Sequence, residues 1–204
     1  MDEGMILTID ANTDDIYQQI VKKYFNDRCL ILNQEVDDDA VENMALSIFQ
    51  WNKEDKNLPI VNRKKIHIYL NSDGGDVLTG NMILSAIKIS KTPVVTIGLG
   101  TCASMASYIL AAGAERYCFP NTIILYHDGE TGYISSGNKG KDIQNFYNKL
   151  SDYNTNFMIE NTKMTKEFLE DIKDREYYMF PDEAKERGIV DKIIGTDCDI
   201  DEIL

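Results

Sequence analysis

Residues 66–100 read IHIYLNSDGGDVLTGNMILSAIKISKTPVVTIGLG and decide the fold class. Ile66–Leu70 is a short apolar run typical of a buried strand, and Val94–Gly98 is a β-branched strand that follows Pro93. Between them, Val77–Ser90 carries apolar residues at helical spacing and follows the turn-forming pair Gly74-Gly75. A strand, a helix and a second strand in this order are typical of a βαβ unit, in which the two strands pair in parallel.

The same alternation of strands and helices continues on both sides of this unit. We predict further strands at Cys29–Leu32, Arg116–Phe119, Thr122–Tyr126 and Val190–Ile194. We predict helices at Asp15–Phe25, after the acids Glu35–Asp39, and at Ser104–Ala112, Lys141–Asn161, Phe168–Lys173 and Asp182–Arg187. No composition break marks a boundary, so the prediction is one α/β domain over residues 1–204 with a largely parallel sheet and an acidic tail, 196–204, that frays.

Composition excludes several classes of function. The 204 residues carry 21 Lys and Arg against 34 Asp and Glu, a net charge of −13, so a nucleic-acid partner is not expected. No apolar run approaches the roughly 18 residues of a membrane span, and the first residues lack the order of a signal peptide, which predicts a cytoplasmic protein without a membrane partner. The four cysteines form no C-x-x-C pair, and we expect neither a metal site nor a cofactor.

Two glycine-containing turns follow neighbouring strands, at Gly74-Gly75 and at Gly100–Met105. Parallel strands end at one edge of the sheet, where open α/β folds place their ligands, and helix N-termini there offer free N–H groups to a developing oxyanion. Ser104 would stand at that edge. Serine is also a preferred helix N-cap, so a purely structural role for Ser104 remains open at this point.

A serine nucleophile needs a base, and the chain has two histidines. His67 lies within the strand Ile66–Leu70, where a packing role is favoured. His127 follows the strand Thr122–Tyr126 and opens a loop, where catalytic groups concentrate. Too many carboxylates are present for the residues alone to identify the group that would orient this histidine.

Four motifs, taken together and in order, resemble the Clp protease family, the ClpP-type proteolytic subunits of ATP-dependent Clp proteases. Early segments agree as well, so the resemblance covers nearly the whole chain. The residues that carry it are Asn71-Ser72-Asp73-Gly74-Gly75, Gly100-x-x-Ala103-Ser104-Met105, the strand ending in His127, Glu183-Ala184-x-x-x-Gly188-x-x-Asp191, Asp15-Ile16-Tyr17 and Glu35-Val36-Asp37-Asp38. The resemblance implies a ClpP/crotonase-like α/β fold of repeated βαβ units and a serine endopeptidase.

Carried over by position, the resemblance makes Ser104 the nucleophile and His127 the general base. It assigns the oxyanion hole to the backbone N–H groups of Gly75 and Met105. The family's third member is an aspartate seven residues before the Glu-Ala pair, and counting back from Glu183 reaches Glu176. Glutamate serves in other hydrolase triads; Asp174 is the competitor for this role.

The chain departs from the family pattern beside these residues. Asp73 replaces the usual proline before the glycine pair, and Asp128-Gly129 replaces the usual Gln-Pro after the histidine. Tyr177 stands where an arginine linked to contact between rings is usual. Two added carboxylates would either depress activity or favour basic peptide segments. Alternatives are therefore a weak or inactive ring subunit, a self-contained phage or prohead maturation peptidase, and a crotonase-like enzyme acting on acyl-CoA.

The resemblance also implies an assembly. Residues 129–161 correspond to the family's handle, a strand and the protruding helix Lys141–Asn161 that pairs when two heptameric rings stack into a tetradecamer. Thr131, Gly132, Tyr133 and Ile134 correspond to the segment that pairs with an extended substrate. Residues 1–14 would form the axial segment, and Tyr69 would lie at the groove for an AAA+ unfoldase that delivers unfolded proteins.

Overall fold

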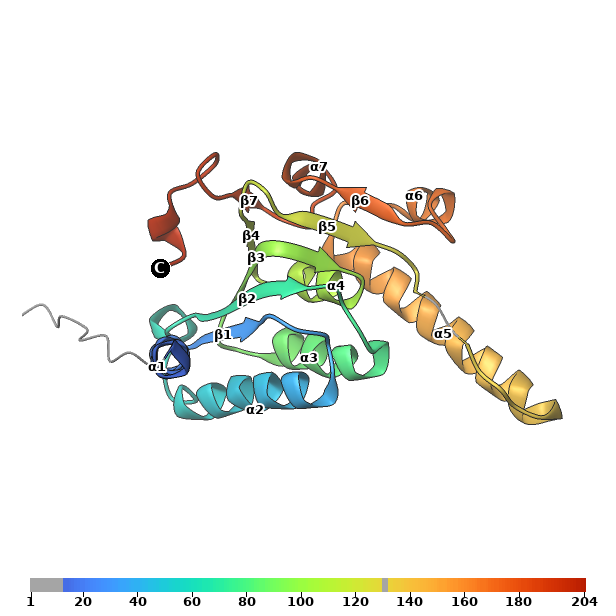
Figure 1. The fold of residues 1–204 in the computed structure, drawn as a ribbon, viewed down its shortest axis with the longest axis horizontal. Coiled ribbons are helices and arrows are strands. Elements are labelled where there is room, and N and C mark those ends of the chain that lie inside the picture. Colours follow the sequence, from blue (N-terminus) through green and yellow to red (C-terminus); the bar gives the residue numbers. More distant parts are fainter. Residues whose placement is uncertain (1–12, 130–131) are drawn as a thin grey trace, which may run out of the picture.

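The computed structural model describes residues 13–129 and 132–204. Strands and helices alternate along the chain (Figure 1). The strands are β1 (Cys29–Leu32), β2 (Ile66–Ser72), β3 (Val94–Ala103), β4 (Glu115–Cys118), β5 (Ile123–Tyr126), β6 (Tyr177–Met179) and β7 (Lys192–Ile193). The helices are α1 (Thr13–Asn26), α2 (Asp38–Glu54), α3 (Val77–Ile89), α4 (Met105–Ala111), α5 (Gly137–Asn161), α6 (Lys166–Asp171) and α7 (Pro181–Glu186), with 3₁₀ turns at Ile60–Asn62 and Ile200–Glu202.

The sheet is mostly parallel, which confirms the predicted α/β class. Its order is β1-β2-β3-β4-β7, while β5 pairs with the end of β3 and β6 pairs with β5. Every pair of strands is parallel except β5–β6. The carboxyl ends of the parallel strands therefore lie along one edge of the sheet, as the sequence predicted.

Strand β3 continues to Ala103, beyond the end at Gly98 that the sequence predicted. The first half of β3 pairs with β4 up to Gly98, and its last three residues, Thr101–Ala103, pair with β5 instead. A Cβ on Gly98 would lie 3.1 Å from Cys102 Sγ and from Thr122 Cγ2. Because glycine has no Cβ, this position leaves room for β3 to change its pairing from β4 to β5. The added pairing brings the end of β3 directly beside the end of β5.

The main core lies between the sheet and the helices α2, α3 and α4 (Figure 1). Asp37 caps α2 by accepting from the N–H of Ala40, and Asp76 caps α3 by accepting from that of Thr79. The fully buried side chains include Ile48 of α2, Ile68 of β2, Ile83 of α3 and Ile109 of α4. This core fixes the strand ends on which the site is built.

The acidic tail packs on the opposite face of the sheet, so the prediction that it frays is wrong. Ile203 is 2% exposed and joins a cluster that includes Val95 and Ile97. The Tyr69 hydroxyl donates to the carbonyl of Ile203 over 3.0 Å. Burial of the Ile203 side chain favours this packing, and the Tyr69 side chain, 7% exposed, lies beneath the tail.

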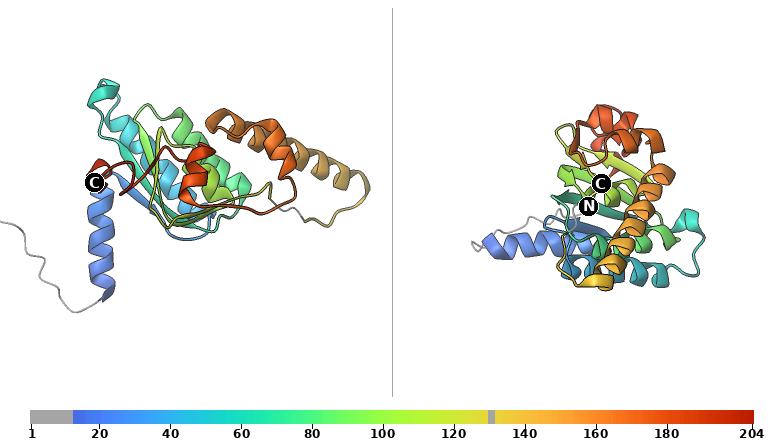
Figure 2. Two further views of the ribbon diagram at one scale, coloured as in Figure 1. Left: turned by 90° about the horizontal axis from the view of Figure 1, so that it is seen from above. Right: turned by 90° about the vertical axis from the view of Figure 1, so that its right-hand side faces the viewer.

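Helix α5 begins at Gly137, earlier than predicted, and its N-terminal part extends beyond the sheet (Figures 1 and 2). Phe157 and Met158 near its C-terminal end are buried, whereas Phe146 and Tyr153 stay exposed. Of the predicted axial segment, residues 1–12 lie outside the described residues, and Thr13 opens α1. None of the helices in the described part of the chain has both the length and the apolar character that a membrane span needs.

Candidate active site

Ser104 stands between the end of β3 and the start of α4 in an unusual backbone conformation. Its φ is 51° and its ψ −126°, and its N–H donates to the carbonyl of Leu125 on β5 over 2.9 Å. A positive φ is uncommon for a residue with a Cβ and marks a position held by its surroundings. The Ser104 hydroxyl does not cap α4; the interpretation of this serine as a simple N-cap is therefore wrong.

His127 lies beside Ser104 because β5 pairs in parallel with the end of β3. Ala103 is paired with Leu125, so the residues that follow them emerge at the same edge of the sheet. His127 Nε2 lies 2.7 Å from Ser104 Oγ, a hydrogen-bond distance. His67, the other histidine, lies within β2 between β1 and β3, where burial lowers the pKa of its imidazole.

Glu176 faces His127 across the antiparallel pair β5–β6. Tyr126 is paired with Tyr177, and one further step of that register sets His127 opposite Glu176. His127 Nδ1 lies 3.0 Å from Glu176 Oε1. A carboxylate only accepts, so in the neutral imidazole Nδ1 carries the proton and Nε2 accepts from the Ser104 hydroxyl.

Asp174, the competing carboxylate, is placed elsewhere. Its φ of 57° turns the backbone away from the strand direction just before β6. Its N–H lies 3.4 Å from Asp128 Oδ2. The structure thus brings Glu176, and not Asp174, into contact with the imidazole of His127.

The two predicted oxyanion donors are Gly75, in the glycine turn after β2, and Met105, the first residue of α4. The N–H of Val36 donates to Gly74 O over 2.8 Å, and that of Asp76 donates to Val36 O over 3.0 Å. Gly75, between them, therefore directs its own N–H away from Val36, as alternate residues of an extended segment do. Among the described residues, no acceptor is bound to the N–H of Gly75 or to that of Met105, the first residue of α4.

Gly74 is the position where a side chain would disturb the site most directly. A Cβ there would lie 2.6 Å from Ser104 Cβ and 2.7 Å from Ala103 O, and φ is 98°. We expect Gly74→Ala to lower the free energy of unfolding by more than about 1 kcal/mol and to abolish reaction of the serine. Thermal denaturation and active-site labelling measure the two effects.

Gly140→Ala is the control for that substitution. Gly140 lies in α5, where an added Cβ meets only ordinary contacts at 3.8 Å, so alanine should stabilise the helix by about 0.5–1 kcal/mol. A Gly74→Ala protein as stable and reactive as the parent would contradict the tight approach of the glycine turn to Ser104.

The four predicted substrate-binding residues differ in their placement. Thr131 lies outside the described residues, and Gly132 lines a cleft beside Gly75. Tyr133 turns its hydroxyl toward the start of α5, 3.1 Å from Gly140 O, and the Ile134 side chain is fully exposed. Only Gly132 of the described three lies against the neighbourhood of the predicted oxyanion donors.

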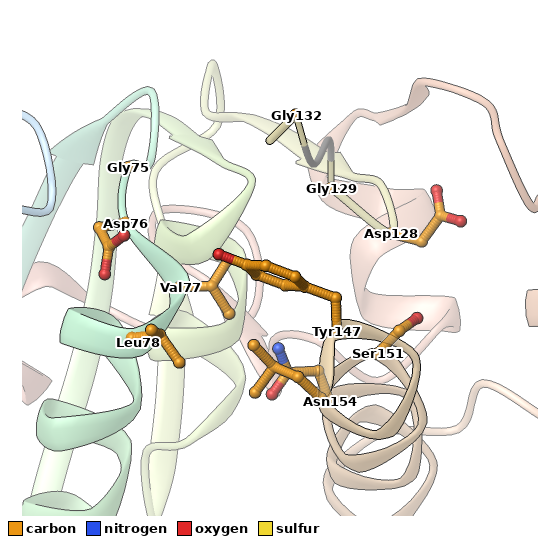
Figure 3. A pocket seen from close by; sticks show the side chains of 11 residues that line it. Gly75, Asp76, Val77, Leu78, Asp128, Gly129, Gly132, Tyr147, Ser151 and Asn154 are labelled. Atoms are coloured by element: carbon orange, nitrogen blue, oxygen red, sulfur yellow. The ribbon is translucent and has the colours of Figure 1, made fainter. Parts of the chain in front are cut away.

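A cleft of about 240 Å³ opens between the start of α3, the loop after His127 and helix α5 (Figure 3). Gly75, Asp128 and Tyr147 are among the residues that line it, one from each of these three segments. The sequence does not show that Tyr147 and the other α5 residues line a cleft, because the helical spacing of the apolar ones resembles that of a core stripe. In the described part of the chain, no group of three or more His, Cys, Asp and Glu side chains could hold a metal ion.

Tyr177, which departs from the expected pattern, makes contacts within its own chain. Its hydroxyl donates to Glu183, and its ring meets that of Phe168 edge-on at 5.1 Å. The Arg187 guanidinium lies 3.8 Å from the centre of the Phe168 ring. These contacts anchor β6, and with it Glu176, to α6 and α7.

Comparison with known protein families agrees with the fold and with the motifs. The family model described as Clp protease matches residues 12–197. The matched range contains the glycine turn, the strand end before Ser104, His127 and the segment from Glu176 to Asp191. A match over this range covers nearly the whole chain and includes every described element of the site. The chain belongs to the Clp protease family.

Proposed function

We propose that this protein is a serine endopeptidase in which Ser104 is the nucleophile, His127 the general base and Glu176 the group that orients the histidine. The observation that carries the proposal is the continuous chain of hydrogen bonds, 2.7 Å from Ser104 Oγ to His127 Nε2 and 3.0 Å from Nδ1 to Glu176 Oε1. A nucleophile, a base and an orienting carboxylate in hydrogen-bond reach are the arrangement that serine hydrolysis requires.

In the proposed reaction, Ser104 Oγ attacks a peptide carbonyl while His127 Nε2 takes its proton. The N–H groups of Gly75 and Met105 donate to the oxygen that becomes negative. The imidazolium then protonates the leaving amine, and water, deprotonated by His127, hydrolyses the acyl-enzyme. Glu176 holds Nδ1–H throughout and stabilises the positive imidazolium.

Membership of the Clp protease family supports a finer proposal about assembly and substrate. We propose that copies of the chain form rings that stack around a chamber, and that a Clp-type AAA+ unfoldase delivers unfolded protein. The exposed Phe146 and Tyr153 on the projecting helix α5 support contact between copies. Light scattering measures the assembly, and degradation of an unfolded against a folded substrate, with and without ATP and the unfoldase, tests delivery.

Labelling with a fluorophosphonate tests the proposed chemistry directly. We expect one adduct per chain, located on Ser104 by peptide mapping, because only this hydroxyl is hydrogen-bonded to a histidine among the described residues. A protein that assembles but takes up no label would instead support the weak or inactive ring subunit. A crotonase-like role has no use for the hydrogen bond between Ser104 and His127, so specific labelling would also count against it.

A further inference from the structure

The side chain of Glu176 has little support from its own surroundings. It is half exposed, and its hydrogen bond to His127 is the only one that it forms among the described residues. Residues 173–176 are all exposed, so Tyr177 is the first covered side chain after Ile172. A glutamate side chain has several free torsions, and it reaches the imidazole regularly only if its backbone is held in place. The position of Glu176 therefore depends on what holds the start of β6.

The Tyr177 hydroxyl bridges two charged side chains of α7. It donates to Glu183 Oε1 and accepts from Arg187 Nη2 over 3.4 Å, so it is used both as a donor and as an acceptor. Burial and the hydrogen bond to Glu183 raise the pKa of the Tyr177 phenol, which therefore keeps its proton near neutral pH. Hydrogen bonds to charged groups are about twice as strong as those between neutral groups. The hydroxyl thus ties β6 to α7.

The helices on both sides of Tyr177 are themselves packed on the core. The Tyr177 ring meets that of Phe168 in α6 edge-on, and the Arg187 guanidinium lies over the Phe168 ring. Ala184 of α7 and Leu169 of α6 are both buried in the main core cluster. Figure 1 shows β6 beside β5, with α6 and α7 next to it. Two short, packed helices thus hold the strand that begins directly after Glu176.

Tyr177 and Glu176 point to opposite sides of the chain. Side chains of neighbouring residues alternate along an extended strand. Burial agrees with this alternation, because Tyr177 packs against the main core cluster while Glu176 and Tyr178 are exposed. An effect of the Tyr177 hydroxyl on the reaction must therefore pass through the backbone of β6 to Glu176.

We propose that Tyr177 is a positioning residue that acts on the reaction through Glu176. Its hydroxyl, held between Glu183 and Arg187, fixes the start of β6 at the place from which the glutamate reaches the imidazole. Tyr177 has no contact with the substrate in this proposal. The inference rests on the proposed peptidase function, in which Glu176 orients His127.

Tyr177→Phe tests the hydroxyl, because it keeps the ring. We expect kcat for peptide hydrolysis to fall about tenfold with little change in KM, since loss of one hydrogen bond to a charged group typically has an effect of about that size. Tyr178→Phe is the matched control. Tyr178 is the next residue, is 62% exposed and lies on the other side of the strand, so its kcat should equal that of the parent. A parental kcat in Tyr177→Phe would overturn the proposal.

A double-mutant cycle with Glu176→Ala separates positioning from a purely structural role. If Tyr177 acts through Glu176, loss of its hydroxyl should change kcat by less than about twofold once the glutamate is absent. A structural role elsewhere in the fold predicts the same tenfold loss, on the order of one decade, in both backgrounds. Equal losses in the two backgrounds would therefore contradict action through Glu176.

Two substitutions of Glu183 test the other end of the hydrogen bond. Glu183→Gln keeps an acceptor for the Tyr177 hydroxyl and should retain most of kcat. Glu183→Leu removes the acceptor and should lower kcat about as much as Tyr177→Phe does. Equal kcat values for Glu183→Gln and Glu183→Leu would show that the hydrogen bond does not position the strand.

Hydrogen exchange measures the anchoring without catalysis. In the Ser104→Ala protein, added Tyr177→Phe should speed exchange of the backbone amides of β6 about tenfold, whereas added Tyr178→Phe should leave it unchanged. Unchanged exchange in the Tyr177 variant would refute the inference and leave the peptidase standing. Absence of peptide hydrolysis by the unmodified protein would instead refute the peptidase and with it the catalytic part of the inference, while exchange would still decide the anchoring of β6.

Discussion

Replacing Ser104 with alanine is expected to lower kcat for peptide hydrolysis on the order of 10⁶-fold, with little change in KM. In the proposed mechanism, the substitution removes the atom that forms the covalent bond to the substrate, while the proposed donors of Gly75 and Met105 stay in place. Serine and alanine both carry a Cβ, so the substitution adds little backbone strain at φ 51° and should not unfold the protein. Steady-state hydrolysis of a fluorogenic peptide, with fluorophosphonate labelling in parallel, measures the loss.

Ser85→Ala is the matched control for that experiment. Ser85 lies on the exposed side of α3, where its hydroxyl donates to Asn81 O over 2.7 Å, so its loss should leave hydrolysis unchanged. Circular dichroism and light scattering on both variants check that fold and assembly persist. Hydrolysis that continues at the parental rate in Ser104→Ala would rule out the serine mechanism.

Replacing Glu176 with alanine is expected to lower kcat on the order of 10⁴-fold, the loss typical when a triad keeps its serine and histidine without the third member. His127 Nδ1 then loses its acceptor, and nothing holds the imidazole with Nε2 free to accept. The loss should fall on kcat rather than KM, because the interaction with Glu176 strengthens when the imidazolium forms. The measurement is again peptide hydrolysis, with labelling rate as a second readout.

Asp174→Asn separates the two carboxylates. Asparagine tolerates the φ of 57° at this position and removes the same charge, so the comparison with Glu176 isolates contact with the histidine. We expect less than a tenfold change in kcat for Asp174→Asn. A larger loss there than in Glu176→Ala would assign the third role to Asp174.

The sequence predicted the alternating strands and helices of the fold and the two candidate site residues, Ser104 and His127, that lie at strand ends. Alternating strands and helices gave the parallel sheet, and the parallel sheet places Ser104 and His127 at one edge. Glu176 could not be derived in this way. It lies 49 residues beyond His127 in the chain and reaches it through β6, which the local pattern did not predict.

The features that the sequence did not predict share a physical cause, because each depends on contacts between residues that are distant in sequence. Strand β6 has three residues, too few to show a period, and exists through its pairing with β5. The tail packs because Ile203 completes an apolar cluster, although acids surround it in the sequence. Asn154 of α5 is 8% exposed, and helical spacing alone does not show that a polar residue is buried there.

In the proposed mechanism, the antiparallel pair β5–β6 makes catalysis depend on a short edge of the sheet that Tyr177 anchors to α6 and α7. It has three residue pairs, so we expect local opening of this edge, which also breaks the Tyr177 contacts, to require less free energy than unfolding of the core. Separation of β6 would withdraw Glu176 from His127 while Ser104, on the long strand β3, stayed where it is. On the proposed mechanism, the fraction of molecules able to react would depend on the pairing equilibrium of one short strand, and conditions that favour the pairing of β6 with β5 would raise the apparent kcat without any change at Ser104.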